Sequence, residues 1–379
     1  MAGELKAFFS PDLVRRLAED MSRAMPAFPS RAFIARATTG LDALELLDRG
    51  KHISRALAAH LPSSYPEAID VILRSLGPVH ATDELMGVGM APFFYLPHVL
   101  FVAERGLDHF DLSMRAQYEL TQRFTCEASI RPYIAKDPER VFTQLARWAR
   151  DRKPHVRRLV SEGTRLRLPW APRVAWLDEH PERVLELLEL LKDDPSTVVR
   201  RSVANNLNDL GKVHAPLLSR TCRAWLSASA SAERRALVEH ALRSAVKRGE
   251  REALAILGFG KKATVAIEDV RFEPKKVAIG DGVEVHFSVR NTTRRPQDLL
   301  VDLAVHFVKA NGKATPKVFK VQRLALAGGA SATLKARVSL KVHTTRKPNP
   351  GVHAVDVLVN GSATPIGAFK VTDRKARSR

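Results

Sequence analysis

The sequence predicts an α-helical N-terminal part followed by a β-sandwich. Three observations support this fold class: the length, the spacing of apolar residues and a change of composition near residue 260. The chain has 379 residues, which suits two or three domains of roughly 100–200 residues each. Leu, Ala, Arg and Glu dominate before this change, and Val and Thr become frequent after it. We therefore expect a helical domain over 1–258, a sandwich over 263–372 and a basic tail over 373–379.

The helical prediction rests on apolar residues that recur every three or four positions, as in the segment 181–194. Pro138, Pro181 and Pro195 mark expected helix starts, because proline in the first turn of a helix sacrifices no hydrogen bond. Glycines, prolines and a histidine interrupt the apolar stretch 85–103, so we predict a buried helical segment there and no membrane span. The N-terminus also lacks the features of a secretory signal, and an intracellular protein is expected.

Alternating apolar and polar residues predict strands in the C-terminal part. The clearest runs cover 283–291, 299–312, 332–340 and 352–361, with Gly- and Asn-rich turns between them. About seven short strands over roughly 110 residues are typical of an immunoglobulin-like (Ig-like) sandwich.

A weak repeat runs through the helical part. Arg123, Arg158, Arg201 and Arg235 are spaced by 35, 43 and 34 residues. An acid or amide follows each arginine four positions later, and this spacing keeps two side chains on one face of a helix. The period predicts an α-α superhelix of HEAT-like repeats, in which these polar stripes merge into one surface.

The positive charge is concentrated toward the C-terminus. The net charge of +20 divides into zero for 1–150, +6 for 151–260 and +14 for 261–379. Such an excess indicates an anionic partner, and adjacent arginines on the repeat surface suit a nucleic-acid backbone. The arginines expected to bind DNA are Arg157, Arg158, Arg165, Arg200, Arg201, Arg234 and Arg235.

Three carboxylates occur among these arginines, although acids repel phosphates. Glu162 lies between two arginine clusters, Asp209 ends the segment that begins near Arg200, and Glu127 occupies the equivalent stripe one repeat earlier. Carboxylates can stabilise positive charge on a sugar while an N-glycosidic bond is hydrolysed, and can orient the attacking water. Each acid could also be a structural ion-pair partner. Trp170, between two prolines, could present its ring to a base or could pack between repeats.

Other chemistry finds little support in the sequence. Only two cysteines occur, which excludes a disulfide-stapled domain and a cysteine-rich zinc site. Phosphate-binding glycine motifs and metal-binding histidine motifs are also absent, so we expect no cofactor and no metal.

Segments 118–133, 157–171 and 193–212 together resemble the AlkC family of bacterial DNA glycosylases. The runs SEGTRLRLPWA and RRSVANNLNDL carry the most specific part of this resemblance, which extends over nearly the whole chain and includes the C-terminal Ig-like domain.

The resemblance implies an activity and a site. Proteins of this family excise cationic methylated bases, such as 3-methyladenine and 3-methylcytosine, from double-stranded DNA without a metal or cofactor. They bend the DNA and do not fully extrude the base. By position, Glu127, Glu162 and Asp209 would form the acidic site and Trp170 would lie beside the damaged base, with Glu119 as a further candidate. A monofunctional, monomeric enzyme of the bacterial cytoplasm, associated with the nucleoid, is expected.

Two other functions remain open at this stage. The first is a HEAT-like protein that binds DNA without catalysis, although such a protein has no need for the three acids and Trp170 together. The second is a protein-interaction scaffold, against which the charge of the sandwich argues.

Overall fold

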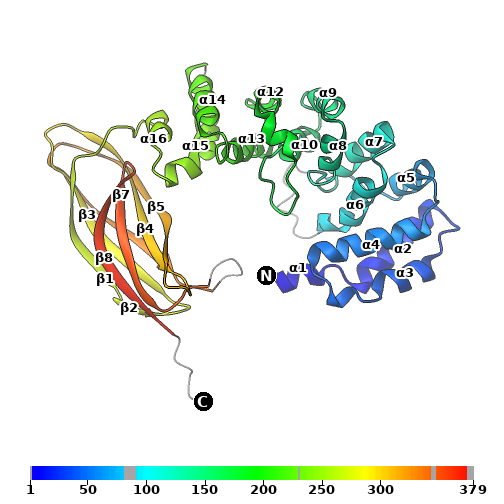
Figure 1. The fold of residues 1–379 in the computed structure, drawn as a ribbon, viewed down its shortest axis with the longest axis horizontal. Coiled ribbons are helices and arrows are strands. Elements are labelled where there is room, and N and C mark those ends of the chain that lie inside the picture. The colour runs from blue at the N-terminus through cyan, green and yellow to red at the C-terminus, as the bar shows by residue number, and fades with distance from the viewer. Residues whose placement is uncertain (1, 81–90, 229–230, 343–346, 374–379) are drawn as a thin grey trace, which may run out of the picture. The chain divides into compact units, whose positions relative to one another are not determined.

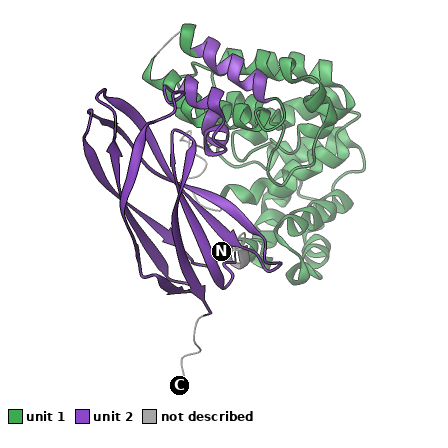
Figure 2. Cartoon of the chain, turned by 60° about the vertical axis from the view of Figure 1, so that its left-hand side comes forward, with its two compact units in different colours: residues 1–214, 226–241 green, residues 215–225, 242–379 purple. Residues whose placement is uncertain are grey.

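The computed structural model describes residues 2–80, 91–228, 231–342 and 347–373. It confirms the predicted fold class, a helical part followed by an Ig-like β-sandwich (Figure 1). The chain forms two compact units, which are residues 1–214 with 226–241 and residues 215–225 with 242–379 (Figure 2). We call the first the helical unit and the second the sandwich unit.

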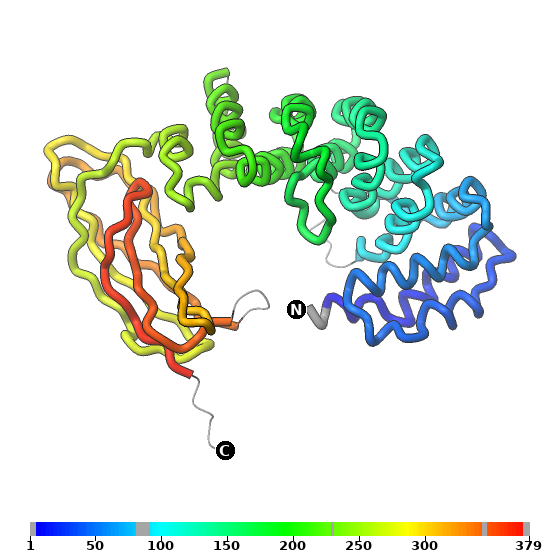
Figure 3. Tube along the Cα trace, viewed as in Figure 1, coloured from blue at the N-terminus to red at the C-terminus, as the bar shows by residue number. Residues whose placement is uncertain are grey.

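Within the described ranges, the helical part of the chain consists of helices α1 to α16 with the 3-10 helices η1 and η3 (Figure 3). The α-helices are α1 (Ala2–Ala7), α2 (Pro11–Ala24), α3 (Ser30–Thr38), α4 (Leu46–His60), α5 (Tyr65–Arg74), α6 (Leu96–Arg105), α7 (Phe110–Thr121), α8 (Arg131–Lys136), α9 (Pro138–Trp148), α10 (Pro154–Gly163), α11 (Ala175–Glu179), α12 (Pro181–Leu191), α13 (Thr197–Leu210), α14 (Ala215–Ala228), α15 (Ala232–Lys247) and α16 (Arg251–Ile256). The 3-10 helices are η1 (Leu41–Ala43) and η3 (Ala91–Tyr95).

The expected proline signals begin two of these helices. Pro138 opens α9, where the Asp137 side chain caps the helix by accepting a hydrogen bond from the Arg140 N–H at 3.2 Å. Pro181 opens α12. Neighbouring helices then pack through their apolar faces, with α10 in contact with α9, α12 and α13. The apolar stripe expected on α13, which includes Val199, Val203 and Leu207, is fully buried.

Part of the expected repeat register is wrong. Arg158, Arg201 and Arg235 do lie on α10, α13 and α15. Arg123, however, lies beyond the end of α7 and donates hydrogen bonds to the Gly77 and Glu119 carbonyls. The first predicted pair, Arg123 and Glu127, therefore does not lie on one helix face, because α7 ends at Thr121.

A different feature repeats between α10 and α13. The Arg157 Nη1 group donates to the carbonyls five and six residues earlier, those of Arg152 and Asp151, at 3.1 and 2.8 Å. The Arg200 Nη1 group makes the same two contacts, to Pro195 and Asp194, at 2.9 and 2.6 Å. Each arginine thus closes the turn that precedes its own helix, which is independent support for a structural repeat.

The described part of the sandwich has eight strands, which form two sheets that pack face to face. The strands are β1 (Val265–Glu273), β2 (Lys276–Ala278), β3 (Gly282–Asn291), β4 (Gln297–Val308), β5 (Ala314–Leu326), β6 (Ser331–Ser339), β7 (Gly351–Val359) and β8 (Ser362–Thr372). The sheet orders are β1-β3-β6 and β2-β8-β7-β4-β5, and every pair except β2 with β8 is antiparallel. Alternate residues of the strands, including Phe287, Leu303 and Val357, are fully buried between the sheets.

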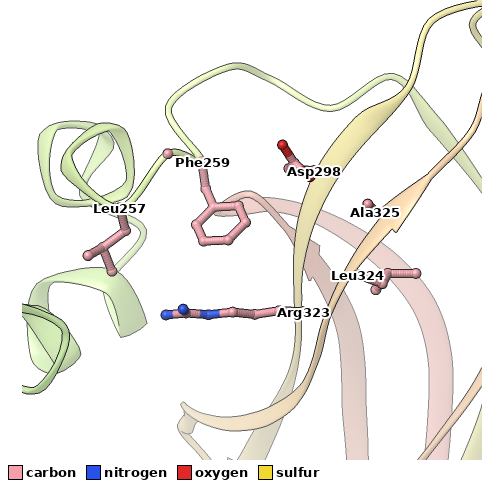
Figure 4. Close-up of a pocket in the computed structure, with 7 residues that line it drawn as sticks. Leu257, Phe259, Asp298, Arg323, Leu324 and Ala325 are labelled. Carbon is pink, nitrogen blue, oxygen red and sulfur yellow. The ribbon is translucent and has the colours of Figure 1, made fainter. Parts of the chain in front are cut away.

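The compact units do not divide at residue 258, where we expected the domain boundary. Residues 242–258 belong to the sandwich unit. The Arg323 guanidinium lies over the Phe259 ring at 5.4 Å, and both side chains line a pocket beside Asp298 on β4 (Figure 4). The Asn360 side chain also donates to the Lys261 carbonyl at 3.2 Å. The connecting segment is therefore packed on the sandwich.

Some sequence predictions fall partly outside the described residues. Residues 85–90 of the apolar stretch and residues 374–379 of the basic tail are among them. From residue 91 the stretch forms η3 and α6, with Val99, Phe101 and Val102 buried. No helix in the described ranges is long and apolar enough to cross a membrane.

Candidate active site

The three predicted carboxylates come together beside the packed helices α10 and α13. Glu162 lies in the last turn of α10 and Asp209 in the last turn of α13, and both are buried, with 4% and 1% exposure. Glu127 lies in the turn between α7 and α8, and its side chain is 23% exposed. Residues that are far apart in the sequence thus form one acidic cluster.

Cations alternate with these acids in what we call the carboxylate–cation chain. Arg158 Nη2 lies 3.2 Å from Glu127 Oε2 and 3.7 Å from Glu162 Oε1. Arg165 Nη1 lies 3.0 Å from Glu162 Oε2, and Arg165 Nε lies 2.8 Å from Asp209 Oδ2.

Lys212 Nζ completes the chain at 2.7 Å from Asp209 Oδ1. The three acids therefore have three cations as partners, and Arg165 joins the two helices.

The two buried carboxylates hold the positive charge on Arg165. Burial alone lowers the pKa of Arg165, but the carboxylates of Glu162 and Asp209 outweigh it and raise that pKa above its ordinary value. A permanently charged guanidinium therefore lies between two buried acids. The cluster can thus present negative charge in a region of low solvent exposure.

Close packing fixes the backbone under the cluster. The Asn206 Nδ2 group on α13 donates to the Ser161 carbonyl at 2.8 Å and to Thr164 Oγ1 at 3.1 Å, which joins α13 to α10. A Cβ atom on Gly163 would lie 2.6 Å from Ile130 Cγ2. Glycine at this position therefore allows the segment after Glu127 to approach the end of α10.

Trp170 lies on the loop that follows α10. Its side chain is 72% exposed and its φ is +63°, a left-handed conformation that is uncommon for a bulky residue. Such backbone costs on the order of 1–3 kcal/mol and persists only where the surroundings hold it. The ring is therefore exposed to solvent. It does not pack between repeats, which was one of the two roles that the sequence left open.

The predicted DNA-binding arginines fall into two groups. Arg157 forms a two-point ion pair with Asp194, at 2.5 and 2.9 Å, in addition to its turn contacts. Arg234 is 3% exposed and forms an ion pair with Asp193. Together with the turn contacts of Arg200, these bonds engage the first arginine of each adjacent pair with partners in the fold itself.

The second arginine of each pair is differently placed. Arg158 belongs to the carboxylate–cation chain. Arg201 and Arg235 are exposed, on α13 and α15. Arg201 makes no hydrogen bond or ion pair with any residue that the structure describes. Glu119, the further candidate, forms an ion pair with Arg123 at 3.1 Å outside the chain.

The structure adds two residues that the sequence reasoning missed. Lys212 lies three positions after Asp209, and the i,i+3 spacing on a helix could have indicated their pairing. Arg131 is 1% exposed and binds backbone carbonyls of the Trp170 loop. No local pattern marks it, because its partners lie 32 to 41 residues further along the chain.

Nothing in the described ranges resembles a metal site. No group of three or more His, Cys, Asp and Glu side chains there could hold a metal ion.

The fold and the acidic site define a helical-repeat protein that carries a C-terminal Ig-like domain. Residues 266–373 match the family model described as "Uncharacterised protein YhaZ, C-terminal Ig-like domain". YhaZ of Bacillus subtilis, an uncharacterised protein, is 32% identical over 374 residues, which cover 97% of this chain and 99% of that protein.

A solved structure is similar over the same length. It is the alkylpurine DNA glycosylase AlkC of Pseudomonas fluorescens, bound to DNA that contains an abasic site analogue. The TM-score is 0.89 at 33% identity, over 97% of this chain and 99% of that one. The chain belongs to the family that includes YhaZ and AlkC.

Proposed function

We propose that this protein is a monofunctional DNA glycosylase that removes cationic alkylated bases, 3-methyladenine and 3-methylcytosine among them, from duplex DNA. The observation that carries the proposal is the carboxylate–cation chain, which places Glu127, Glu162 and Asp209 together beside helices that also carry exposed arginines. The similarity to AlkC, a glycosylase bound to DNA, supports the same activity.

The chemistry follows from the charge of the substrate. A base that already carries a positive charge leaves as a neutral molecule when the electron pair of the C1′–N bond moves onto it, so no acid is needed to protonate it. Positive charge then develops on the sugar, and buried carboxylates stabilise it. Water adds to C1′ and loses a proton to a carboxylate or to solvent. The products are a free base and an abasic site.

The geometry suggests a division of labour between the two buried acids. Both oxygens of Asp209 accept short contacts, from Arg165 at 2.8 Å and from Lys212 at 2.7 Å. Glu162 Oε1 has a longer contact, 3.7 Å to Arg158. We assign orientation of the water to Glu162 and electrostatic stabilisation to Asp209, with Glu127 in support. Trp170 would lie against the damaged nucleotide while the DNA is bent and the base is not fully extruded.

Exposed cations on the sandwich would hold the DNA backbone. Strand β5 lies at the edge of its sheet and carries Lys317, Lys320 and Arg323 without an acid. Lys309 and Lys313, at the β4–β5 turn, are also exposed. Replacing one lysine that contacts a phosphate by a neutral residue lowers the slope of log affinity against log salt concentration by about one. The double substitution of Lys309 and Lys313 by Gln should therefore reduce the slope by about two.

A matched control lies on the other sheet. Lys335 on β6 pairs in register with His286, on a face that also carries Glu284. Replacing Lys335 by Gln should leave the slope unchanged. An unchanged slope in the double variant as well would refute the proposed role of the β4–β5 turn.

The competing function is DNA binding without catalysis, in which the carboxylate–cation chain only stabilises the fold. Base release from methylated DNA in EDTA separates the two. The proposed enzyme releases 3-methyladenine and 3-methylcytosine without added metal, and Glu162→Gln slows that release. A binding protein releases neither base.

A further inference from the structure

Arg131 is a buried cation that the proposed mechanism does not use. It is the first residue of α8 and is 1% exposed. Its Nε donates to the Pro172 carbonyl at 3.0 Å, and its Nη1 donates to the carbonyls of Gly163 and Arg165 at 3.0 and 2.9 Å. One guanidinium therefore joins both ends of the loop formed by residues 163–172.

This loop has few other means of holding its shape. The Arg165 N–H bonds to the Glu162 carbonyl at 3.3 Å, and Pro169 and Pro172 have no N–H to donate. The Arg167 side chain fastens the middle of the loop to Asp178 at 2.7 Å. The contacts from Arg131 thus replace backbone hydrogen bonds that the sequence of the loop cannot supply.

Charge neutralisation is not what Arg131 provides. It makes no ion pair with a described residue, and burial lowers its pKa to about 10, opposed mainly by Asp178. An unpaired buried charge is costly, so its value must lie in geometry. A guanidinium offers five donors in a rigid planar fork, which can bind carbonyls from two directions, whereas the lysine ammonium is a compact point charge.

The loop carries two groups of the candidate active site. Arg165 bridges Glu162 and Asp209, and its own carbonyl is one of the three that Arg131 binds. Trp170 lies in the same loop with a left-handed backbone and an exposed ring. Strained backbone at an exposed position requires support from its surroundings.

We propose that Arg131 is a positioning residue that fixes Trp170 and the backbone of Arg165 relative to Glu162. The role in catalysis rests on the proposed function, whereas the role in holding the loop does not. Loss of the guanidinium fork should loosen the Trp170 loop while the helices remain packed.

The chain offers a matched control in Arg49 on α4. Arg49 is 5% exposed and likewise donates to backbone carbonyls, those of Leu44, Lys6, Phe9 and Asp42, at 3.0 to 3.1 Å. These partners lie in and between the first helices of the chain, outside the carboxylate–cation chain. Arg49→Lys therefore measures how much stability is lost with a buried guanidinium that binds carbonyls, at a position remote from the candidate active site.

The experiment compares Arg131→Lys with Arg49→Lys in three measurements. Thermal unfolding should show a similar loss of Tm. The single-turnover rate of base release, measured well below Tm, should fall at least tenfold in Arg131→Lys and less than twofold in Arg49→Lys. The fluorescence of Trp170 is obtained by subtracting the signal of a Trp170→Phe version of each protein. Acrylamide quenching and anisotropy of this fluorescence should show a more mobile ring in Arg131→Lys only.

A second variant covers the case in which Arg131→Lys does not fold. Pro172 is exposed, and Pro172→Gly should loosen the same anchor and change the Trp170 signal in the same direction. Equal loss of rate in the two arginine variants at equal Tm would overturn the proposal. An unchanged Trp170 signal in both Arg131→Lys and Pro172→Gly would also overturn it. If the wild type releases no base, the proposed function fails, and the fluorescence still tests the loop.

Discussion

Replacing Arg165 by Met should destabilise the helical unit, because it removes a cation from between two buried carboxylates. The Arg165 side chain is 12% exposed and contacts two carboxylates that are themselves 5% and 1% exposed. Removing one partner of a buried ion pair costs about 3–5 kcal/mol. Lys212 still pairs with Asp209 at 2.7 Å, and Arg158 lies 3.7 Å from Glu162. We therefore expect a loss of about 3 kcal/mol, the lower end of that range.

Urea denaturation followed by the helical circular dichroism signal measures this loss. We would compare the variant with the wild type, with Arg140→Met as a control. Arg140 pairs with Asp111 at 2.9 Å, but the two side chains are 49% and 86% exposed, so less than about 1 kcal/mol is expected. A loss in Arg165→Met no larger than that in Arg140→Met would contradict the structural role assigned to Arg165.

Three other predictions test separate parts of the account. Trp170→Ala should slow base release about 5- to 150-fold, the equivalent of one lost stacking contact. Its Tm should be nearly unchanged because the ring is exposed. A slower rate that is accompanied by a large fall in Tm would contradict this. Gly163→Ala should cost about 1–3 kcal/mol, because the new methyl group would lie 2.6 Å from Ile130 Cγ2. Ile130→Leu removes that methyl group and should restore part of the loss; thermal melts that show no rescue would exclude this contact. Arg157→Ala should lower Tm, because it removes the ion pair with Asp194, and should leave the salt dependence of DNA binding unchanged. Arg201→Ala should leave Tm unchanged and lower the slope of log affinity against log salt concentration by about one. The reverse pattern would invert our assignment of the two arginines.

The fold could be predicted from the sequence because its signals are local. Proline at position 138, with Asp137 before it, gave a helix start that the structure reproduces. The alternating run 283–291 corresponds to β3 (Gly282–Asn291). The repeat register failed at Arg123, because spacing between arginines says nothing about where the intervening chain turns.

The site could be predicted only in part. Glu127, Glu162 and Asp209 were expected from arginine-rich surroundings and from a family resemblance, and the structure does bring them together. Adjacent arginines such as Arg157 and Arg158 look alike in the sequence, yet neighbouring positions on a helix face different directions. Distant residues decide which arginine forms an ion pair within the fold, as Asp194 does for Arg157.

The direct test of the central claim is base release by the wild type and Glu162→Gln. Gln has nearly the same shape as Glu but no negative charge, so it removes the stabilisation of the sugar cation. We expect release of 3-methyladenine and 3-methylcytosine in EDTA by the wild type, and a single-turnover rate lower by about 100-fold or more in the variant, at equal duplex affinity. Absence of release by the wild type, or an unchanged rate in Glu162→Gln, would contradict the account.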